Sequence, residues 1–327
     1  MPGRLTSSIA WPPSAVQLTG TVTNKGAEFT LNINSPTTNK DFNWTVGLLW
    51  AQNRNNVVSI TGASYVNIPN AIVSAVAQPG YVTGSIQGFD WIRCGNGVVY
   101  NGIDLDNTAG QCQGAPKGAQ YIAANGFPVI DQSALRILGS YQPNWQGSIR
   151  GAINFLQKWQ FSFLIDHRDG GKSYNGTRGA LYVYGRHVDT DIGHGGGTME
   201  TFGTASWHPG TVAGPGAGTP VLIDGNWFQN DGGSFGNNTA DFVENSGFTK
   251  LREVAVQYTW DGRWVTHNMG MSSIQFRVAG RNLHTWTGYT GVDPESNLEG
   301  AGNLVQGVDW FGNPQNRSIV FSIGLNK

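Results

Sequence analysis

The sequence predicts an all-β protein, folded either as a barrel or as a sandwich. Apolar and polar residues alternate along several stretches, and the clearest of them runs from Phe42 to Ala51. A period of two is typical of a strand with one apolar face and one polar face. Glycine accounts for 47 of the 327 residues, which fits long loops between strands. No run of about 18 apolar residues occurs, so we expect no transmembrane helix.

The composition excludes two classes of protein. The chain has 20 Lys and Arg against 21 Asp and Glu, a formal net charge of -1. A nucleic-acid-binding protein needs a basic excess to neutralise phosphates, so nucleic acid is not expected as a partner. Twelve Trp residues also argue against a disordered chain, because disordered segments are poor in aromatic residues.

The first alternating stretches predict a three-stranded meander at residues 15–23, 29–33 and 42–50. A tight turn at Asn24–Gly26 would join the first two strands, because glycine adopts positive φ without steric cost. A second turn is expected at residues 35–40. The longest of these strands has about ten residues, the length with which a barrel strand crosses a bilayer.

Five more strands are expected at residues 147–156, 159–168, 251–260, 274–281 and 318–326, which makes about eight strong strands. Three long inserts, at about residues 54–145, 170–247 and 284–316, separate them. These inserts are rich in glycine, proline and asparagine and lack strong periodicity. Stretches of this length without periodicity are usually functional loops or disordered segments.

The chain resembles one known family in five motifs that occur in the family's order. They are NKGAEFTLN (24–32), GSYQPNWQGSI (139–149), WQFSFLIDHRDGG (159–171), AGRNLHTWTGYTGVDPESN (279–297) and NPQNRSIVFSIGLN (313–326). This pattern is similar to the C-terminal portion of the SusC/RagA-like TonB-dependent outer-membrane receptors. The chain departs from the family at its end, because Leu325–Lys327 lacks the aromatic residue with which such strands usually finish.

The resemblance implies the C-terminal part of a transmembrane barrel of about 22 antiparallel strands. It implies a chain that is incomplete at its N-terminus, without plug domain and signal peptide. The implied function is import of a large nutrient, a glycan or an oligopeptide, across the cell outer membrane. The implied partners are a SusD-like surface lipoprotein, the TonB system acting through the missing plug, and outer-membrane lipid. The family implies neither an enzyme nor a cofactor.

Loop lengths suggest an orientation, because outer-membrane barrels have short periplasmic turns and long extracellular loops. The turns at 35–40, 157–158 and 261–271 would be periplasmic, and the three inserts would be extracellular. The short Asn24–Gly26 turn does not fit, since it falls on the extracellular side.

Strand parity predicts which residues face the barrel lumen and which face lipid. The lumen-facing candidates are Arg150, Glu253, Arg277 and Arg281. The lipid-facing candidates on the closing strand are Ile319, Phe321, Ile323 and Leu325. Aromatic residues in the inserts are candidates for substrate contact, with self-packing of the loops as the alternative; they are Trp207, Trp227, Phe228, Trp286 and Trp310.

Cys94 and Cys112 form a disulfide if the protein is extracytoplasmic, and are otherwise free thiols. His187, Asp189, Asp191 and His194 have metal-ligand chemistry, but no second motif supports them, and we predict no metal site. His167-Arg168-Asp169 and Gly171-Lys172-Ser173 only partly match kinase and phosphate-loop patterns, and strand-to-loop structure explains both.

An alternative reading is a secreted β-sandwich module that binds carbohydrate through loop tryptophans. This alternative predicts a protein that is soluble without detergent. A secreted β-rich hydrolase would require an acid/base pair of carboxylates, and nothing in the sequence marks such a pair.

Overall fold

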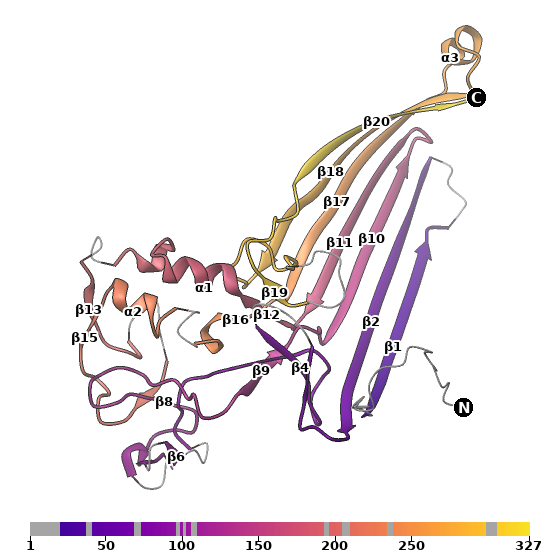
Figure 1. Ribbon diagram of the computed structural model, residues 1–327. Coiled ribbons are helices and arrows are strands. Elements are labelled where there is room, and N and C mark those ends of the chain that lie inside the picture. The colour runs from indigo at the N-terminus through magenta and orange to yellow at the C-terminus, as the bar shows by residue number, and fades with distance from the viewer. Residues whose placement is uncertain are drawn as a thin grey trace, which may run out of the picture.

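The computed structural model describes residues 20–36, 41–68, 73–95, 99–100, 103–105, 110–192, 196–204, 210–233, 238–298 and 306–327. Its largest element is a curved seven-stranded sheet, here called the wall (Figure 1). In sheet order the wall consists of β1 (Gly20–Asn34), β2 (Phe42–Ile60), β10 (Trp145–Phe155), β11 (Trp159–Asp169), β17 (Phe248–Trp260), β18 (Ser273–Thr287) and β20 (Ser318–Asn326).

All neighbouring strands of the wall pair antiparallel. The prediction of a mostly β protein is therefore confirmed. The sheet ends at β1 on one side and at β20 on the other, so it does not close on itself. Closure into a barrel of about 22 strands stays a prediction.

The predicted turn at Asn24–Gly26 is wrong, because β1 runs straight through these residues. Gly26 pairs with Asn53 of β2, and a methyl group built on Gly26 would lie 2.8 Å from the carbonyl oxygen of Gln52. The glycine thus permits a close strand approach instead of a turn. The expected meander is a two-stranded hairpin, β2 continues to Ile60, and the wall has seven strands instead of about eight. Residues 24–26 therefore no longer conflict with the predicted orientation, in which the extracellular connections are long.

The short connections of the wall all lie at one end. They join the end of β1 to the start of β2, β10 to β11 through residues 156–158, and β17 to β18 through the segment with α3 (Arg263–Asn268), which Figure 1 shows at the end opposite the large inserts. Leu156 and Gln157 have positive φ and close the tight turn between β10 and β11. The long connections gather at the other end, as the sequence predicted.

The wall has one apolar face whose side chains are largely exposed. Phe321 and Ile319 of β20 are 76% and 68% exposed. Aromatic residues lie near both ends of this face. Trp159 contacts Tyr258 near the short turns, with ring centroids 4.7 Å apart, and Trp145 contacts His167 near the inserts, at 4.6 Å. No second sheet of the described chain covers the wall, which argues against the sandwich alternative.

The long connections fold into a compact body at one end of the wall, here called the loop globule (Figure 1). Its strands are short: β3 (Val66–Ile68), β4 (Ser74–Ala77), β5 (Ser85–Gly88), β6 (Val99–Tyr100), β7 (Ile103–Asp104), β8 (Gln120–Tyr121), β9 (Arg136–Ser140), β12 (Lys172–Asn175), β13 (Thr198–Glu200), β14 (Val212–Ala213), β15 (Val221–Ile223), β16 (Val243–Asn245) and β19 (Val308–Asp309). Its helices are α1 (Gly176–Val183) and α2 (Gly225–Gln229).

The loop globule has a core of its own. Trp91, Phe228, Phe242 and Tyr182 are buried together, with residues from all three inserts in the same cluster. A smaller cluster surrounds a disulfide between Cys94 and Cys112. No described helix is long and apolar enough to cross a membrane. Because one buried cluster contains residues of all three inserts, the inserts form a folded body attached to the wall.

Candidate functional site

The polar face of the wall brings the predicted lumen-facing residues together. Arg150, Glu253 and Arg281 lie in one cross-strand row, which starts at Asn32 of β1 and ends at Ser318 of β20. Glu253 forms salt bridges with Arg281, at 3.1 Å, and with Arg277. All four residues thus share one face, as parity predicted. That this face lines a lumen stays a prediction.

Arg150 lies in a groove of about 470 Å³ on this face. Its Nη2 donates to Oδ1 of Asn32 at 3.1 Å. A methyl group built on Gly47 would lie 2.5 Å from Nε of Arg150, so glycine at this position makes room for the guanidinium. Glu253 lines the same groove and supplies the opposite charge.

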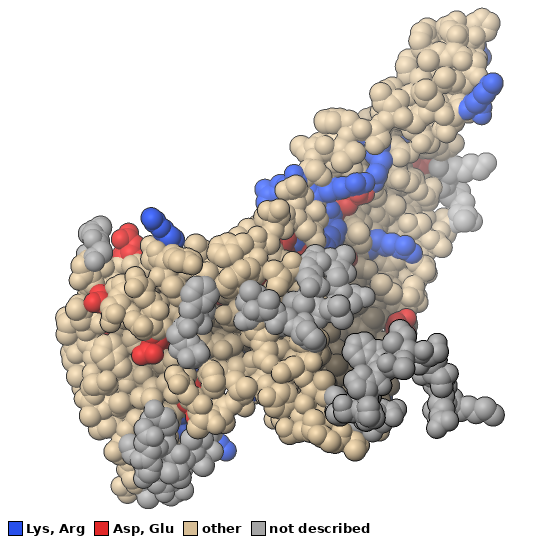
Figure 2. All heavy atoms as spheres, viewed as in Figure 1, with Lys and Arg blue, Asp and Glu red and all other residues tan. Residues whose placement is uncertain are grey.

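A charged cluster, here called the clamp, joins the third insert to the wall. Lys250 of β17 is only 2% exposed, and its Nζ bonds Asp293 at 2.7 Å and Glu295 at 2.5 Å. Arg252 bonds Asp166 of β11 at 2.7 Å and the other oxygen of Glu295 at 2.6 Å. A bulge between Leu251 and Glu253 lets Arg252 reach the polar face. Figure 2 shows charged side chains gathered on this face, beside the loop globule.

The clamp also determines the charge of its two carboxyl groups. Burial alone would raise their pKa values, but the hydrogen bonds to Lys250 and Arg252 outweigh it. The pKa of Asp293 and that of Glu295 therefore lie below their ordinary values. Both carboxyl groups are ionised at neutral pH, so ion pairs hold the third insert to the wall.

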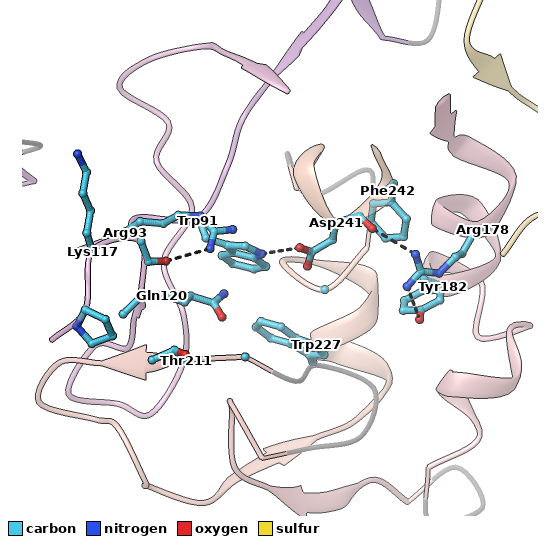
Figure 3. Close-up of a pocket in the computed structure, with 15 residues that line it drawn as sticks. Trp91, Arg93, Lys117, Gln120, Arg178, Tyr182, Thr211, Trp227, Asp241 and Phe242 are labelled. Carbon is cyan, nitrogen blue, oxygen red and sulfur yellow. Dashed lines mark hydrogen bonds between the residues drawn. The ribbon is translucent and has the colours of Figure 1, made fainter. Parts of the chain in front are cut away.

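The loop globule contains a cavity of about 420 Å³, drawn in Figure 3. Nε1 of Trp91 donates to Asp241 at 2.9 Å, and Arg178 donates to the backbone oxygen of Asp241 at 3.2 Å. Arg93 and Lys117 line the opposite side. The lining therefore has three cationic side chains and one carboxylate. A cavity with this lining favours ligands rich in hydrogen-bond acceptors.

Hydrogen bonds and ring contacts position the two arginine side chains that line this cavity. Arg178 bonds Glu244 at 2.9 Å and stacks over the rings of Tyr182 and Phe242. Burial raises the pKa of Tyr182 to about 12, so its hydroxyl stays neutral. Arg93 forms a two-pronged bond with Asp90. These contacts fix the two arginines in place and fit a binding role better than proton transfer.

Trp227 lines this cavity and also a second one of about 530 Å³. The second lining is rich in amide and carboxylate groups and includes Asn125, Gln132, Asn226 and Asp231. Burial raises the pKa of Asp231. The two cavities therefore differ in charge although they share one indole ring.

The structure separates the predicted substrate-contact aromatics into different environments. Trp227 and Phe228 are 6% and 2% exposed and belong to the core of the loop globule, so Phe228 packs against protein. Trp310 packs against the same core. Trp286 is 53% exposed but belongs to β18, which continues to Thr287, so the third insert begins later than predicted. Trp207 lies outside the described residues.

The cluster of His and Asp residues after α1 has a structural role. Nδ1 of His187 accepts the backbone N–H of Asp189 at 3.2 Å, and Asp189 bonds the hydroxyl of Tyr182. Burial lowers the pKa of His187. His194 is outside the described residues, and those that are described hold no group of three metal-binding side chains.

The sequence reasoning missed the clamp and the cationic cavity. Asp293 and Glu295 stand in a motif that supported the family resemblance, so the motif was a usable signal for the clamp. Lys250 and Arg252 lie in β17. Strand parity alone does not place both side chains on the polar face, because the bulge after Leu251 shifts the alternation by one residue. Arg93 and Arg178 have no periodic context that would mark them.

Comparison with curated proteins finds relatives along nearly the whole chain. TonB-dependent receptor P26 of Formosa agariphila is 25% identical over 320 residues, which are 96% of this chain and 30% of the relative. TonB-dependent receptor P3 of the same organism is 22% identical over 324 residues, which are 96% of this chain and 29% of the relative. The chain thus spans about three tenths of the length of these relatives. No family model matches it.

Comparison with solved structures supports the fold. The RagAB peptide importer in its open-open state superposes with a TM-score of 0.57 at 18% identity, over 94% of this chain and 29% of that chain. The closed-closed state gives 0.54 at 16% identity, over 94% and 30%. Nearly the whole chain is thus similar in sequence to TonB-dependent receptors and in fold to the RagAB peptide importer, in line with the predicted resemblance to the C-terminal portion of the SusC/RagA-like receptors.

Proposed function

We propose that this chain forms part of the wall and the outer loops of an importer that moves a large nutrient across the outer membrane. The observation that supports this is the wall itself, which has an exposed apolar face and a charged polar face. A soluble protein would cover such an apolar face, whereas a membrane barrel turns it toward lipid. Lipid therefore covers Phe321 and its neighbours, and Arg150 and Glu253 face the lumen.

The strand count is compatible with this assignment. Seven strands are about a third of a barrel with about 22 strands, comparable with the 29–30% of its relatives that the chain spans. The edge strands β1 and β20 then pair with further strands of the complete barrel, which removes both open edges.

The nutrient is a glycan or an oligopeptide, and the loop globule lies at the extracellular entrance. A SusD-like lipoprotein captures the nutrient above this globule, and TonB supplies the energy. The cavities around Trp227 support a role of the globule in contact with large polar ligands, since their volumes lie within the range of ligand sites.

Two spin labels test the position of the wall. We expect a label at Phe276 to contact lipid and a label at Arg277 to contact water, because neighbouring residues of a strand point to opposite faces. Accessibility to oxygen and to a water-soluble nickel complex distinguishes the two environments. Water contact at both positions would contradict the lipid-facing assignment.

An uptake assay tests the energy source. Cells that express the receptor should accumulate fluorescent oligosaccharides or oligopeptides only while TonB is present. Accumulation that persists after deletion of TonB would contradict energy-coupled import, and accumulation of neither ligand class would contradict the nutrient assignment.

A further inference from the structure

Three of the motifs that support the family resemblance meet at one small cavity between the wall and the loop globule. The cavity is about 220 Å³ and lies at the loop end of β11. Tyr141 belongs to the second motif, Arg168 to the third, and Glu295 and Ser296 to the fourth.

Arg168 is the only cation that lines this cavity among the described residues, and its described side-chain hydrogen bond goes to a backbone oxygen and not to a carboxylate. Its Nη2 donates to the backbone oxygen of Tyr141, which is a neutral acceptor. Its Nε is buried and has no hydrogen-bond partner in the described chain. The nearby carboxylate of Glu295 is already engaged by Lys250 and Arg252. Glu295 attracts Arg168 but makes no described hydrogen bond with it, so the buried Nε of Arg168 can still donate to a ligand oxygen.

Hydroxyl groups surround the same space. The hydroxyl oxygen of Ser296 is buried and lacks a hydrogen-bond partner among the described residues. Ser246 and Ser173 also line the cavity and are 2% and 3% exposed. An unpartnered guanidinium nitrogen and an unpartnered hydroxyl beside one cavity are the donors that an oxyanion requires.

A glycine next to the lining leaves room around these polar groups. Gly171 has a φ of +79°, and a methyl group built on it would lie 2.9 Å from the oxygen of Tyr141 and 3.0 Å from Nη2 of Arg168. The same methyl group would lie 3.2 Å from the hydroxyl oxygen of Ser246. A side chain at residue 171 would therefore crowd the donors.

We propose that this cavity binds a single carboxylate group, held by Arg168 together with Ser296 and Ser246. The planar guanidinium matches the two oxygens of a carboxylate. The lining holds one cation, Arg168, and one carboxylate, Glu295, so it disfavours a dianion such as sulfate. The cavity is smaller than the range of about 300–1,000 Å³ for sites that enclose a whole ligand, so it accepts a small acid or one end of a larger one.

Acetate is the first probe. The full chain, purified from membranes in detergent, is titrated with carboxyl-labelled acetate, and binding is followed by broadening of the labelled carbon resonance. We expect saturable binding that sulfate does not displace. Absence of saturable acetate binding, or displacement of acetate by equimolar sulfate, would overturn the proposal. The assay needs no energy source, so its result is independent of import.

Substitutions locate the site. Arg168→Gln should abolish acetate binding, and Ser296→Ala should weaken it about tenfold, the value of one hydrogen bond to a charged group. Arg263→Gln on α3 and Ser322→Ala on β20 are matched controls far from the cavity and should bind acetate normally. Near-ultraviolet circular dichroism checks that each variant is folded. If Arg168→Gln does not fold, Ser296→Ala alone decides, and unchanged affinity in that variant would refute the site.

A second comparison identifies the source of the carboxylate. Trialanine has a free carboxyl end, and its C-terminal amide lacks it. Tighter binding of trialanine than of acetate, lost in the amide, assigns the site to the acidic end of a larger ligand. Equal affinity for acetate and trialanine assigns it to a free small acid. Equal binding of trialanine and its amide would contradict recognition of a carboxylate.

Discussion

Lys250 shows how much the surroundings of a single residue can change its energetic role. It is almost fully buried between Asp293 and Glu295, while Lys158 forms an exposed pair with Asp261 at 3.2 Å. The same ammonium group is thus present once in a buried network and once in solvent. Buried pairs cost several kcal/mol to break because the partner charge is left without compensation, and exposed pairs contribute little.

Substitution of the two lysines tests this difference. Lys250→Met should lower the free energy of unfolding by about 3–5 kcal/mol, and Lys158→Met should lower it by no more than about 1 kcal/mol. Urea titration followed by tryptophan fluorescence measures both variants. Adding Asp293→Asn to Lys250→Met should recover part of the loss, since it removes the uncompensated charge. Equal effects of the two lysine substitutions would show that the clamp does not stabilise the protein.

The clamp should also open in acid. The pKa values of Asp293 and Glu295 are lowered in the folded state, so their stabilising contribution is complete above the ordinary values of about 3.9 and 4.3. The contribution is lost as the pH falls below those values and through the folded-state pKa values. A spin label at exposed Val292 should become mobile over this range, while a label at Met199 on β13 should not. Mobility at Val292 that is independent of pH would refute the clamp.

At the scale of elements, the alternation of apolar and polar residues predicted most of the wall. It located β10, β11, β17, β18 and β20 and put Arg277 and Arg281 on one face. It failed at Gly26, because a glycine that permits close strand pairing has the same sequence signature as a glycine in a turn. Only the long partner strand β2 distinguishes the two cases.

The loop globule could not be predicted in the same way. Trp227 and Phe228 stand among glycine residues without periodicity, so the sequence gives no indication that they are buried. Their burial depends on contacts between inserts that are far apart in the chain, such as the stacking of Trp91 on Trp227. Non-local packing of this kind has no local sequence pattern.

The disulfide constrains the chain in the smaller buried cluster of the loop globule. Cys94 and Cys112 lie in a small buried cluster with Ile92, Leu105 and Tyr121. Replacing both cysteines by alanine should lower local stability by about 2–4 kcal/mol, because the closed loop regains conformational freedom. Hydrogen exchange should accelerate at residues 118–122 and remain slow in β17. Unchanged exchange at residues 118–122 would show that packing alone holds this cluster.

At the scale of the whole molecule, the main question is which solvent covers the apolar face of the wall. Phe321 and Ser322 are neighbours near the middle of β20 and point to opposite faces. Ser322 pairs with Arg277 on the polar face, whereas Phe321 is 76% exposed on the apolar face. A carboxylate introduced at either position therefore probes one face at the same depth.

Phe321→Asp should lower the free energy of unfolding in lipid vesicles by about 2 kcal/mol or more. The substitution removes an apolar side chain worth about 1.5–3 kcal/mol and exposes a charge to lipid. Ser322→Asp should be nearly neutral, because the new carboxylate lies opposite Arg277 in a hydrated environment. Urea titration of the folded protein in vesicles measures both changes. If water covered the apolar face, a charge in place of an exposed phenylalanine would cost little, and the two variants would be equally stable; that result would remove the main support for the importer.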